Sequence, residues 1–343
     1  MNRQSPTIKQ IADATGVHPS TVSRALDPSK KHLVAADVAK RISAEAASLG
    51  YRPNRLAASL RLGRSNLVGV LLPDIANPVF GPILGGIAET LAAAGYAPIV
   101  ADAGNDSSQQ ISFVEKLLNQ RVDGLILATV SQDDKLVGYC LERGLPIVLV
   151  NRSEARDRVS SVVSDDDMGM RFAVDHLVSL GHKRIAHVAG PLTTSTGLLR
   201  RDGFKRAMES HGLEGIVREA SHYTRQAGSA AAAGLKRSAV TAVAAANDLI
   251  ALGVLDALRA AGLRCPEDVA VVGHNDMPLM DVVSPSLTTV RIEHREMGRM
   301  AARMLVESFE TGSNEIRHVV LCPELVVRSS TASSRPTAQR AKR

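Results

Sequence analysis

The chain has 343 residues and a mass of 36.4 kDa, which is long enough for two or three domains with sizeable cores. Hydrophobic residues make up 45% and charged residues 22%, which excludes a mainly disordered chain, a collagen-like chain and a coiled-coil rod. The formal net charge of +6 is unevenly distributed, because residues 1–64 carry eleven Lys and Arg against four Asp and Glu. Residues 65–334 carry 26 basic against 31 acidic residues. A basic arm on a mildly acidic body indicates a polyanionic partner for the arm.

The cysteines and the N-terminus indicate a reducing compartment. Cys140, Cys265 and Cys322 lie far apart, and no spacing of Cys and His suits zinc. Residues 1–16 lack the apolar stretch of a signal peptide, and no run of 18 apolar residues could span a membrane. We therefore expect a cytoplasmic protein with no membrane contact, no metal and no cofactor.

The first fifty residues predict a small group of helices. Thr7 begins a capping-box pattern, and the first helix is expected to end at Gly16. Pro19 suits the first turn of a second helix that runs to Leu26, and a third helix is expected over 36–49. Two helices joined by a turn with a glycine, in a basic segment, are typical of a helix-turn-helix motif.

The second helix of this motif would lie in the major groove of DNA. Hydroxyl groups and a guanidinium on it can reach base edges and phosphates, while Val22 and Leu26 would face the helical core. The side chains expected to contact DNA are His18, Pro19, Ser20, Thr21, Ser23 and Arg24.

From Leu67 onward, short apolar runs alternate with helical segments. This alternation predicts parallel sheets with helices on both faces, and about 270 residues favour two α/β lobes over one. The expected strands are 67–72, 97–101, 124–128, 146–150, 159–163, 184–189, 240–245 and 269–272, with apolar runs near Val319 and Leu325. The expected helices are 80–94, 109–120, 168–180, 198–211, 226–236, 249–261 and 295–310.

Several motifs together resemble the lactose-repressor/galactose-repressor family of bacterial transcriptional regulators. The N-terminal motif and the segment after it are specific, whereas the motifs of the body are weaker when taken singly. The matching stretches are TIKQIA (7–12), GVHPSTVSRAL (16–26), GYRPNRLA (50–57), NPVF (77–80), GHKRIA (181–186), AGP (189–191), AND (246–248), VVGHND (271–276) and LTTV (287–290).

The resemblance implies an α/β fold with an added all-α DNA-binding domain. The body would resemble type I periplasmic binding proteins, with two lobes of parallel sheets around a ligand cleft. The implied divisions are a helix-turn-helix domain over 1–50, a hinge over 51–65, lobe 1 over about 66–163 and 294–325, lobe 2 over about 164–293, and a basic, disordered tail over 329–343 after a body that ends at residue 328.

The hinge of this family forms a helix on DNA and inserts a leucine into the minor groove, where an apolar wedge bends the duplex. By motif position, Leu60 is that leucine, and Arg61 would contact the adjacent backbone or groove. A helix of seven residues is marginal alone, so we expect it to be ordered only with DNA and a partner hinge. The further DNA-binding candidates are Thr7, Asn54, Arg55 and Ala57.

The cleft between the lobes is the implied effector site. Arg200 matches the family's cleft arginine, which holds a carboxylate or hydroxyl groups of the ligand. Ligands of open α/β sheets bind at the carboxyl ends of strands, which adds residues that follow strands. The candidates are Asn77, Phe80, Arg152, Asp165, Arg200, Asn247, Asn275 and Asp276.

The chemistry of the effector stays open between two classes. Two cleft arginines and His274, which stands where the family usually has an aromatic residue, favour a sugar acid or another carboxylate. A neutral sugar is the alternative, although only 3% of the residues are aromatic and only Phe80 and Tyr223 are expected to be available for stacking.

The expected function is that of a repressor which binds a palindromic operator as a homodimer and responds to a small-molecule effector. The sequence lacks G-x-S-x-G, H-E-x-x-H, G-x-x-x-x-G-K-[ST] and G-x-G-x-x-G motifs, so no enzymatic activity is expected. The alternatives are a solute-binding protein of a transporter and a sugar-modifying α/β enzyme. The basic N-terminal motif disfavours the first, and the lack of a nucleophile–base pair disfavours the second.

Overall fold

The structure is a computed structural model that describes residues 6–27, 30–51, 64–132, 134–235, 239–313 and 315–332. The chain divides into two compact units, Met1–Ser65 and Asn66–Arg343. Each unit has its own hydrophobic core.

The N-terminal unit contains the helices that the sequence predicts. Thr7 caps the first of them in a capping box, because its Oγ1 accepts from the backbone N–H of Gln10 at 3.3 Å and Gln10 Oε1 accepts from the N–H of Thr7 at 2.8 Å. Gly16 ends that helix with a φ of 68°, a left-handed conformation that suits glycine. Ile11, Val22 and Ile42 lie in the centre of the small core. The elements are α1 (Ile8–Thr15), α2 (Pro19–Ala25), the 3-10 helix η1 (Lys31–Leu33) and α3 (Ala36–Ser48).

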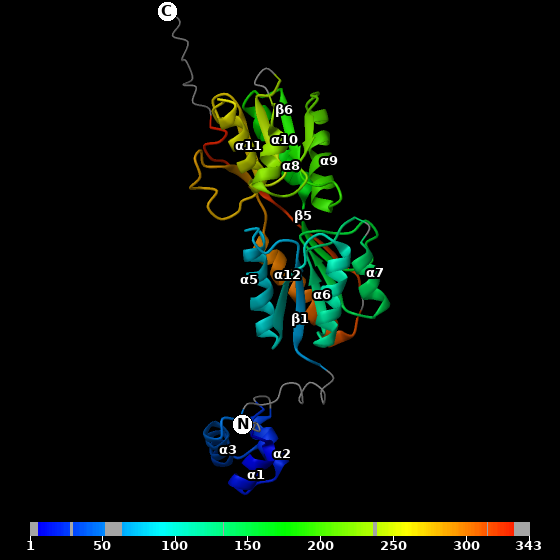
Figure 1. The fold of residues 1–343 in the computed structure, drawn as a ribbon, viewed down its shortest axis with the longest axis vertical. Coiled ribbons are helices and arrows are strands. Elements are labelled where there is room, and N and C mark those ends of the chain that lie inside the picture. Colours follow the sequence, from blue (N-terminus) through cyan, green and yellow to red (C-terminus); the bar gives the residue numbers. More distant parts are fainter. Residues whose placement is uncertain are drawn as a thin grey trace, which may run out of the picture. The chain divides into compact units, whose positions relative to one another are not determined.

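The second unit consists of two lobes, each built on a six-stranded sheet (Figure 1). Within the described ranges, the strand pairs are parallel except β10 with β12, which confirms the expected α/β fold class. The lobe 1 sheet has the order β11-β5-β4-β3-β1-β2, with β1 (Leu67–Leu72), β2 (Ala97–Asp102), β3 (Gly124–Leu127), β4 (Ile147–Val150), β5 (Ser161–Ser164) and β11 (His318–Leu321). The lobe 2 sheet has the order β12-β10-β9-β8-β6-β7, with β6 (Ile185–Ala189), β7 (Ile216–Glu219), β8 (Ala242–Ala245), β9 (Ala270–Asn275), β10 (Thr288–Arg291) and β12 (Glu324–Val326).

Helices cover both faces of each sheet, so the central strands are buried on both sides. In β1, for example, Val68 and Val70 pack toward α5 and α12, whereas Leu71 packs toward α6 and α7. This double burial explains why these strands appear in the sequence as continuous apolar runs. The helices are α5 (Phe80–Ala93), α6 (Ser107–Asn119), α7 (Lys135–Glu142) and α12 (His294–Thr311) in lobe 1, and α8 (Asp166–Ser179), α9 (Ser195–Ser210), α10 (Arg225–Ala232) and α11 (Asp248–Ala260) in lobe 2.

The chain passes from one sheet to the other three times. Asp165 separates β5 from α8, residues 292–293 separate β10 from α12, and residues 322–323 separate β11 from β12. Each connection has one or two residues. The two lobes are therefore tied by three short segments that start at the carboxyl ends of strands.

The structure contains elements that the apolar pattern does not predict. β7 is an edge strand whose residues are largely exposed, so it lacks an apolar run. β10 was expected only as a motif, and α7 is a short helix whose buried side is limited to Leu136, Val137 and Cys140.

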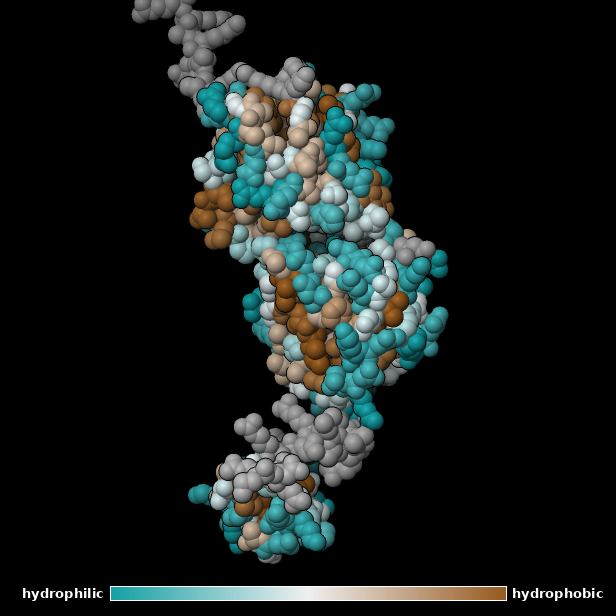
Figure 2. Space-filling view, viewed as in Figure 1, coloured by the Kyte–Doolittle hydropathy of each residue, from teal (hydrophilic) through white to brown (hydrophobic). Residues whose placement is uncertain are grey.

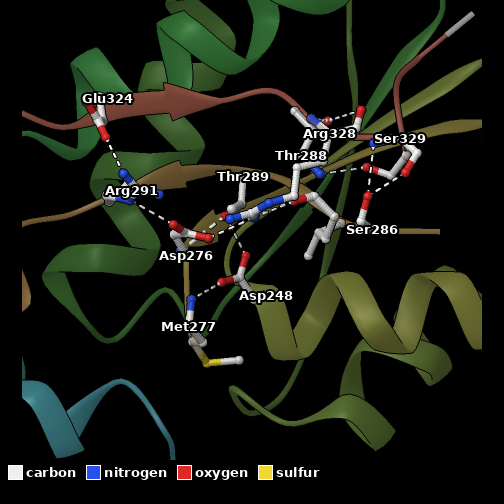
Figure 3. A network of polar contacts seen from close by, with 12 residues as sticks. Asp248, Asp276, Met277, Ser286, Thr288, Thr289, Arg291, Glu324, Arg328 and Ser329 are labelled. Atoms are coloured by element: carbon white, nitrogen blue, oxygen red, sulfur yellow. Dashed lines mark hydrogen bonds and ion pairs between the residues drawn. The ribbon is translucent and has the colours of Figure 1, made fainter. Parts of the chain in front are cut away.

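The C-terminal segment 328–332 packs against lobe 2, although a disordered tail was expected from Ser329. Ser330 Oγ donates to the carbonyl of Val271 at 2.6 Å and accepts from the N–H of Thr288 at 2.8 Å. Ser329 and Ser286 are hydrogen-bonded through their hydroxyl groups (Figure 3). The hydroxyl groups in this segment, which favour disorder by composition, instead satisfy backbone groups beside β9 and β10. The packed body therefore extends at least to Ala332.

No helix in the described part of the chain is both long enough and apolar enough to cross a membrane.

Two glycines allow α5 and α12 to pack closely, and we expect Gly86→Ala to destabilise lobe 1. A Cβ at Gly86 would collide with the backbone carbonyl of Arg295, and one at Gly298 would collide with that of Ile83. Because backbone cannot give way cheaply, the free energy of unfolding should fall by about 1–3 kcal/mol, measured by urea denaturation. Gly81→Ala, in the same helix but with open space around its Cβ position, should be neutral or slightly stabilising. Equal effects of the two substitutions would contradict this account.

Candidate functional site

The helix α2 presents a polar face on the N-terminal unit. His18, Pro19, Ser20 and Arg24 are exposed, and Thr21 and Ser23 are half-buried. His18 Nδ1 accepts from the N–H of Ser20 at 3.2 Å, so His18 caps the helix. Val22 is fully buried and Leu26 packs against the core. The predicted DNA-contacting side chains therefore lie on one helix, opposite its apolar face.

The remaining DNA-binding candidates divide into two groups. Thr7 is exposed and is engaged in capping α1. The hinge candidates lie outside the described residues, and they are Asn54, Arg55, Ala57, Leu60 and Arg61.

A cavity of about 440 Å³ lies between the two lobes, and both lobes contribute to its lining. Each lining segment follows the carboxyl end of a parallel strand, which is where open α/β sheets bind ligands. Figure 2 shows hydrophilic residues on both sides of the junction between the lobes. The lining residues from lobe 1 are Pro73, Asp74, Asn77, Asn105, Thr129, Val130, Ser131 and Arg152, and those from lobe 2 are Pro191, Thr193, Thr194, Ser221, His222, Tyr223 and Thr224.

Arg152, which follows β4, places a buried guanidinium at this cavity. Its side chain is only 5% exposed. Its Nη1 donates to Asn105 Oδ1 at 3.1 Å and lies 3.5 Å from the carbonyl oxygen of Thr129. Burial lowers the pKa of Arg152. A guanidinium remains charged under ordinary conditions even so, because its unperturbed pKa is above 12.

Tyr223 forms part of the lobe 2 wall of the cavity. Its hydroxyl lies 2.9 Å from Thr196 Oγ1 and 3.4 Å from Thr194 Oγ1. The ring lies against Gly190, where any Cβ would collide with it. Gly190 is therefore required for this ring position, which provides an aromatic surface with a fixed hydroxyl.

Arg200 lies in a buried polar cluster of lobe 2. Its Nε donates to Asp166 Oδ1 at 2.7 Å, its Nη1 donates to the carbonyl of Ala246 at 2.6 Å, and its Nη2 donates to Asn275 Oδ1 at 3.3 Å. Burial raises the pKa of Asp166, and the neighbouring Arg200 opposes this rise. Burial also keeps His274 neutral by lowering its pKa well below the usual value. The charge of Arg200 is thus matched by Asp166.

The loop after β9 holds Asn275 toward Arg200. Asn275 and Asp276 have φ angles of 109° and 51°, which are unusual for residues with a side chain. Asp248 stabilises this loop, because its Oδ2 accepts from the N–H of Met277 at 2.7 Å and its Oδ1 accepts from Thr289 at 2.6 Å (Figure 3). The side chain of Asp276 forms ion pairs with arginines of β10 and the C-terminal segment.

The structure brings only some of the effector candidates together. Asn77 and Arg152 line the cavity, and Arg200 and Asn275 share the buried cluster. Four candidates have other contacts. Phe80 is 2% exposed and packs in the lobe 1 core. Two candidates cap helices: Asp165 accepts from the N–H of Met168 at 2.9 Å in α8, and Asn247 accepts from the N–H of Ile250 at 2.8 Å in α11. Asp276 forms ion pairs with Arg291 at 2.7 Å and with Arg328 at 2.8 Å.

Sequence reasoning missed several polar residues of the cavity. Asn105 and Thr129 each follow a predicted strand, so the strand-end rule could have found them. Asp166 does not line the cavity but pairs with Arg200 in the buried cluster, and the run of three aspartates in which it lies predicts only the start of a helix. Ser221, His222 and Thr224 could not have been found in this way, because they follow β7, which has no apolar pattern. Tyr223, in the same segment, was expected from the sequence as an aromatic residue available for stacking.

A second cavity, of about 530 Å³, lies at the amino end of β4, away from the interlobe junction. It is lined by residues of lobe 1 alone, including Pro146 and Thr311. Both arginines in its lining are already paired, since Arg317 contacts Glu307 at 2.6 Å and Arg158 contacts Glu154. The interlobe cavity is therefore the better candidate for a ligand that controls the lobes.

A helix-turn-helix unit joined to a two-lobed α/β body is the architecture of a ligand-binding transcriptional regulator. Residues 7–54 match the family of bacterial regulatory proteins called the lacI family, and residues 174–331 match a periplasmic binding protein-like domain. The transcriptional regulator MalR of Streptomyces coelicolor is 37% identical, over 95% of this chain and 97% of its own. The regulator CelR of Thermobifida fusca is 33% identical, over 96% and 99%.

Solved structures give the same assignment. The lac repressor dimer bound to operator and the anti-inducer ONPF superposes with a TM-score of 0.85 at 27% identity, covering 96% of this chain and all of that one. The CelR–cellobiose complex has a TM-score of 0.71 at 31% identity, covering 95% and 99%. The chain belongs to the lacI family and is a DNA-binding transcriptional regulator, as the sequence resemblance implies.

We expect Arg200→Ala to destabilise lobe 2 in a pH-dependent way. The substitution leaves the Asp166 carboxylate buried without its cation, which should lower the free energy of unfolding by about 3–5 kcal/mol near neutral pH. Because the pKa of Asp166 then rises further above its unfolded value, the folded state binds the proton more tightly, and the deficit should shrink as the pH is lowered. Urea denaturation between neutral and mildly acidic pH measures this. Adding Asp166→Asn should recover part of the lost free energy of unfolding. A loss that changes neither with pH nor on substitution of Asp166 would contradict the assignment of Arg200 as the cation paired with Asp166.

Proposed function

We propose that this protein is a homodimeric repressor that binds a palindromic operator and is controlled by a small metabolite held between its lobes. The metabolite class is a sugar, a sugar acid or another carboxylate. The observation that carries the proposal is the cavity of about 440 Å³ whose walls come from both lobes, in a chain that also has an exposed helix-turn-helix face.

Ligand control follows from the way the lobes are joined. A ligand that touches both walls favours the lobe arrangement that fits it, and three connections of one or two residues let the lobes reorient without unfolding. The chain enters lobe 1 directly from the hinge at Asn66. A change in lobe arrangement can thus alter hinge geometry, with a coupling of about 1–3 kcal/mol.

Dimeric DNA binding is supported by the basic arm and by the similarity to the operator-bound lac repressor dimer. Two copies of α2 would read half-sites about one helical turn apart. Asn54, Arg55, Ala57, Leu60 and Arg61 would act at the hinge as the family resemblance implies. The proposed division of the chain is the one expected from the sequence, with the body extended to Ala332.

We assign the protein no catalytic role, in agreement with its regulator relatives. Within the described ranges, no group of three or more His, Cys, Asp or Glu side chains could hold a metal ion. A regulator of transcription acts where the chromosome is, so the proposal includes a cytoplasmic location.

The proposal is tested by selecting genomic fragments on the purified full-length protein. We expect enrichment of a palindromic site, with binding that weakens steeply as salt rises. Arg24→Ala should weaken binding to that site by about 1–3 kcal/mol without changing thermal stability, because Arg24 is exposed. Arg303→Ala removes an exposed arginine from the body and serves as the charge-matched control. Absence of any preferred sequence, with and without metabolites, would refute the proposal.

A separate substitution tests the hinge assignment. Leu60→Ala should weaken specific operator binding at least tenfold, because it removes the apolar wedge that stabilises bent DNA. Ligand binding to the body should be unaffected, since Leu60 precedes the body in the chain. Gel-shift titration and calorimetry measure the two affinities, and unchanged operator affinity would remove Leu60 from this role.

A further inference from the structure

We propose that the effector carries an oxyanion, a carboxylate or a phosphate, and that Arg152, Thr129 and Asn105 hold it. This inference rests on the proposed function, because it names the chemistry of the ligand that the interlobe cavity would take. It commits to one of the two effector classes that the sequence leaves open.

The first observation is that Arg152 is buried without a matching negative charge. Among the described residues it forms no ion pair with a carboxylate, and its hydrogen-bond partners are the neutral Asn105 amide and the Thr129 carbonyl. A buried charge without a counter-charge is costly. Arg200 shows the contrast, because its guanidinium is paired with Asp166 at 2.7 Å.

The nearby carboxylates do not fill this role. Asp134 attracts Arg152 only at a distance, because its carboxylate accepts hydrogen bonds from Ser131 and from the N-terminus of α7. Arg200 also acts electrostatically on Arg152, but as a positive group it supplies no counter-charge, and its own charge is matched by Asp166. The surroundings of Arg152 therefore favour a negative group that comes with the ligand.

The second observation is an unused donor beside this guanidinium. Thr129 is 2% exposed and lines the cavity, yet its Oγ1 has no hydrogen-bond partner among the described residues. Asn105 uses its side-chain oxygen for Arg152, which leaves its amide N–H groups as donors. A guanidinium, a hydroxyl and an amide that meet at one wall form a donor set suited to carboxylate or phosphate oxygens.

The rest of the lining suits hydroxyl groups on the same ligand. Asp74 supplies carboxylate oxygens, and its Oδ1 already orders the loop by accepting from Ala76 N–H at 2.9 Å. Asn77, Thr193 and Ser221 add neutral polar groups. The ligand should therefore be a hydroxylated small anion, such as a sugar acid or a sugar phosphate.

The experiment measures binding of matched pairs to the full-length protein by calorimetry. The pairs are gluconate and glucose, galacturonate and galactose, and glucose 6-phosphate and glucose, together with further aldonates, hexuronates and hydroxycarboxylates. We expect at least one acid to bind, and its neutral parent to bind about 100-fold more weakly or not at all. Binding of gluconate or galacturonate would identify a carboxylate as the recognised group, and binding of glucose 6-phosphate would identify a phosphate.

Substitutions then locate the charge recognition. Arg152→Met should weaken binding of the acid by about 100-fold, Thr129→Val should weaken it about tenfold, and Arg152→Lys should fall between wild type and Arg152→Met. Arg156→Met removes an exposed arginine from the same loop and should leave affinity unchanged.

A measurement without ligand keeps the inference testable whatever the folding of the variants. Removing an unmatched buried charge should raise the melting temperature of the ligand-free protein in Arg152→Met, whereas Arg200→Met should lower it. If Arg152→Met lowered the melting temperature of the ligand-free protein as much as Arg200→Met, Arg152 would be a structural residue and the inference would be overturned.

Two other results would overturn the inference that the effector is an anion held by Arg152. In the first, neutral sugars bind and none of the acids does. In the second, an acid binds but Arg152→Met leaves its affinity unchanged. In either case, dissociation of the operator complex by the ligand that does bind, a neutral sugar in the first and an acid in the second, would leave the proposed function intact, so the two failures are distinguishable.

Discussion

The organisation of this protein depends on where its parallel strands end. In both sheets the carboxyl ends of the parallel strands face the interlobe junction, and the three connections between lobes leave from the ends of β5, β10 and β11. Residues that follow strands are released from the sheet hydrogen bonds, so they can supply polar side chains without disturbing the core. The interlobe cavity and the connections between the lobes therefore both lie at the carboxyl ends of parallel strands, although the connecting residues themselves do not line the cavity. A molecule that fills the cavity contacts both lobes.

Buried charge is managed differently on the two sides of this junction. In lobe 2, burial lowers the pKa of His187 to about 4, so His187 is neutral near pH 7, and Arg200 is balanced by Asp166. His187 donates through Nδ1 to the Ala244 carbonyl at 2.8 Å, which fixes its tautomer, since a carbonyl can only accept. In lobe 1, the charge of Arg152 has no such balance among the described residues. Lobe 2 thus provides a neutral, preorganised wall, and lobe 1 provides the unbalanced positive charge.

Helices and strands that pack on the core along their whole length can be predicted from the sequence, whereas exposed ones cannot. β1 and α5 appear in the sequence because each packs on the core along its length, whereas the exposed β7 leaves no pattern. For the site, the strand-end rule placed Asn77 and Arg152 correctly at the cavity lining. It could not foresee that Phe80 turns into the core or that Asp276 turns toward two arginines. Those orientations depend on the first turn of α5 and on the left-handed backbone after β9, and side-chain type determines neither.

The position of Tyr223 gives the protein a spectroscopic property. The chain has four tyrosines, five phenylalanines and no tryptophan, so tyrosine dominates its near-ultraviolet absorption and emission. Tyr96 packs on Phe309 with ring centroids 5.1 Å apart, and Arg143 covers the ring of Tyr139 at 3.5 Å. Tyr51 belongs to the N-terminal unit, which leaves Tyr223 as the tyrosine at the cavity wall. Occupancy of the cavity thus has an optical reporter in the unmodified chain, with no label to perturb the joint between the lobes.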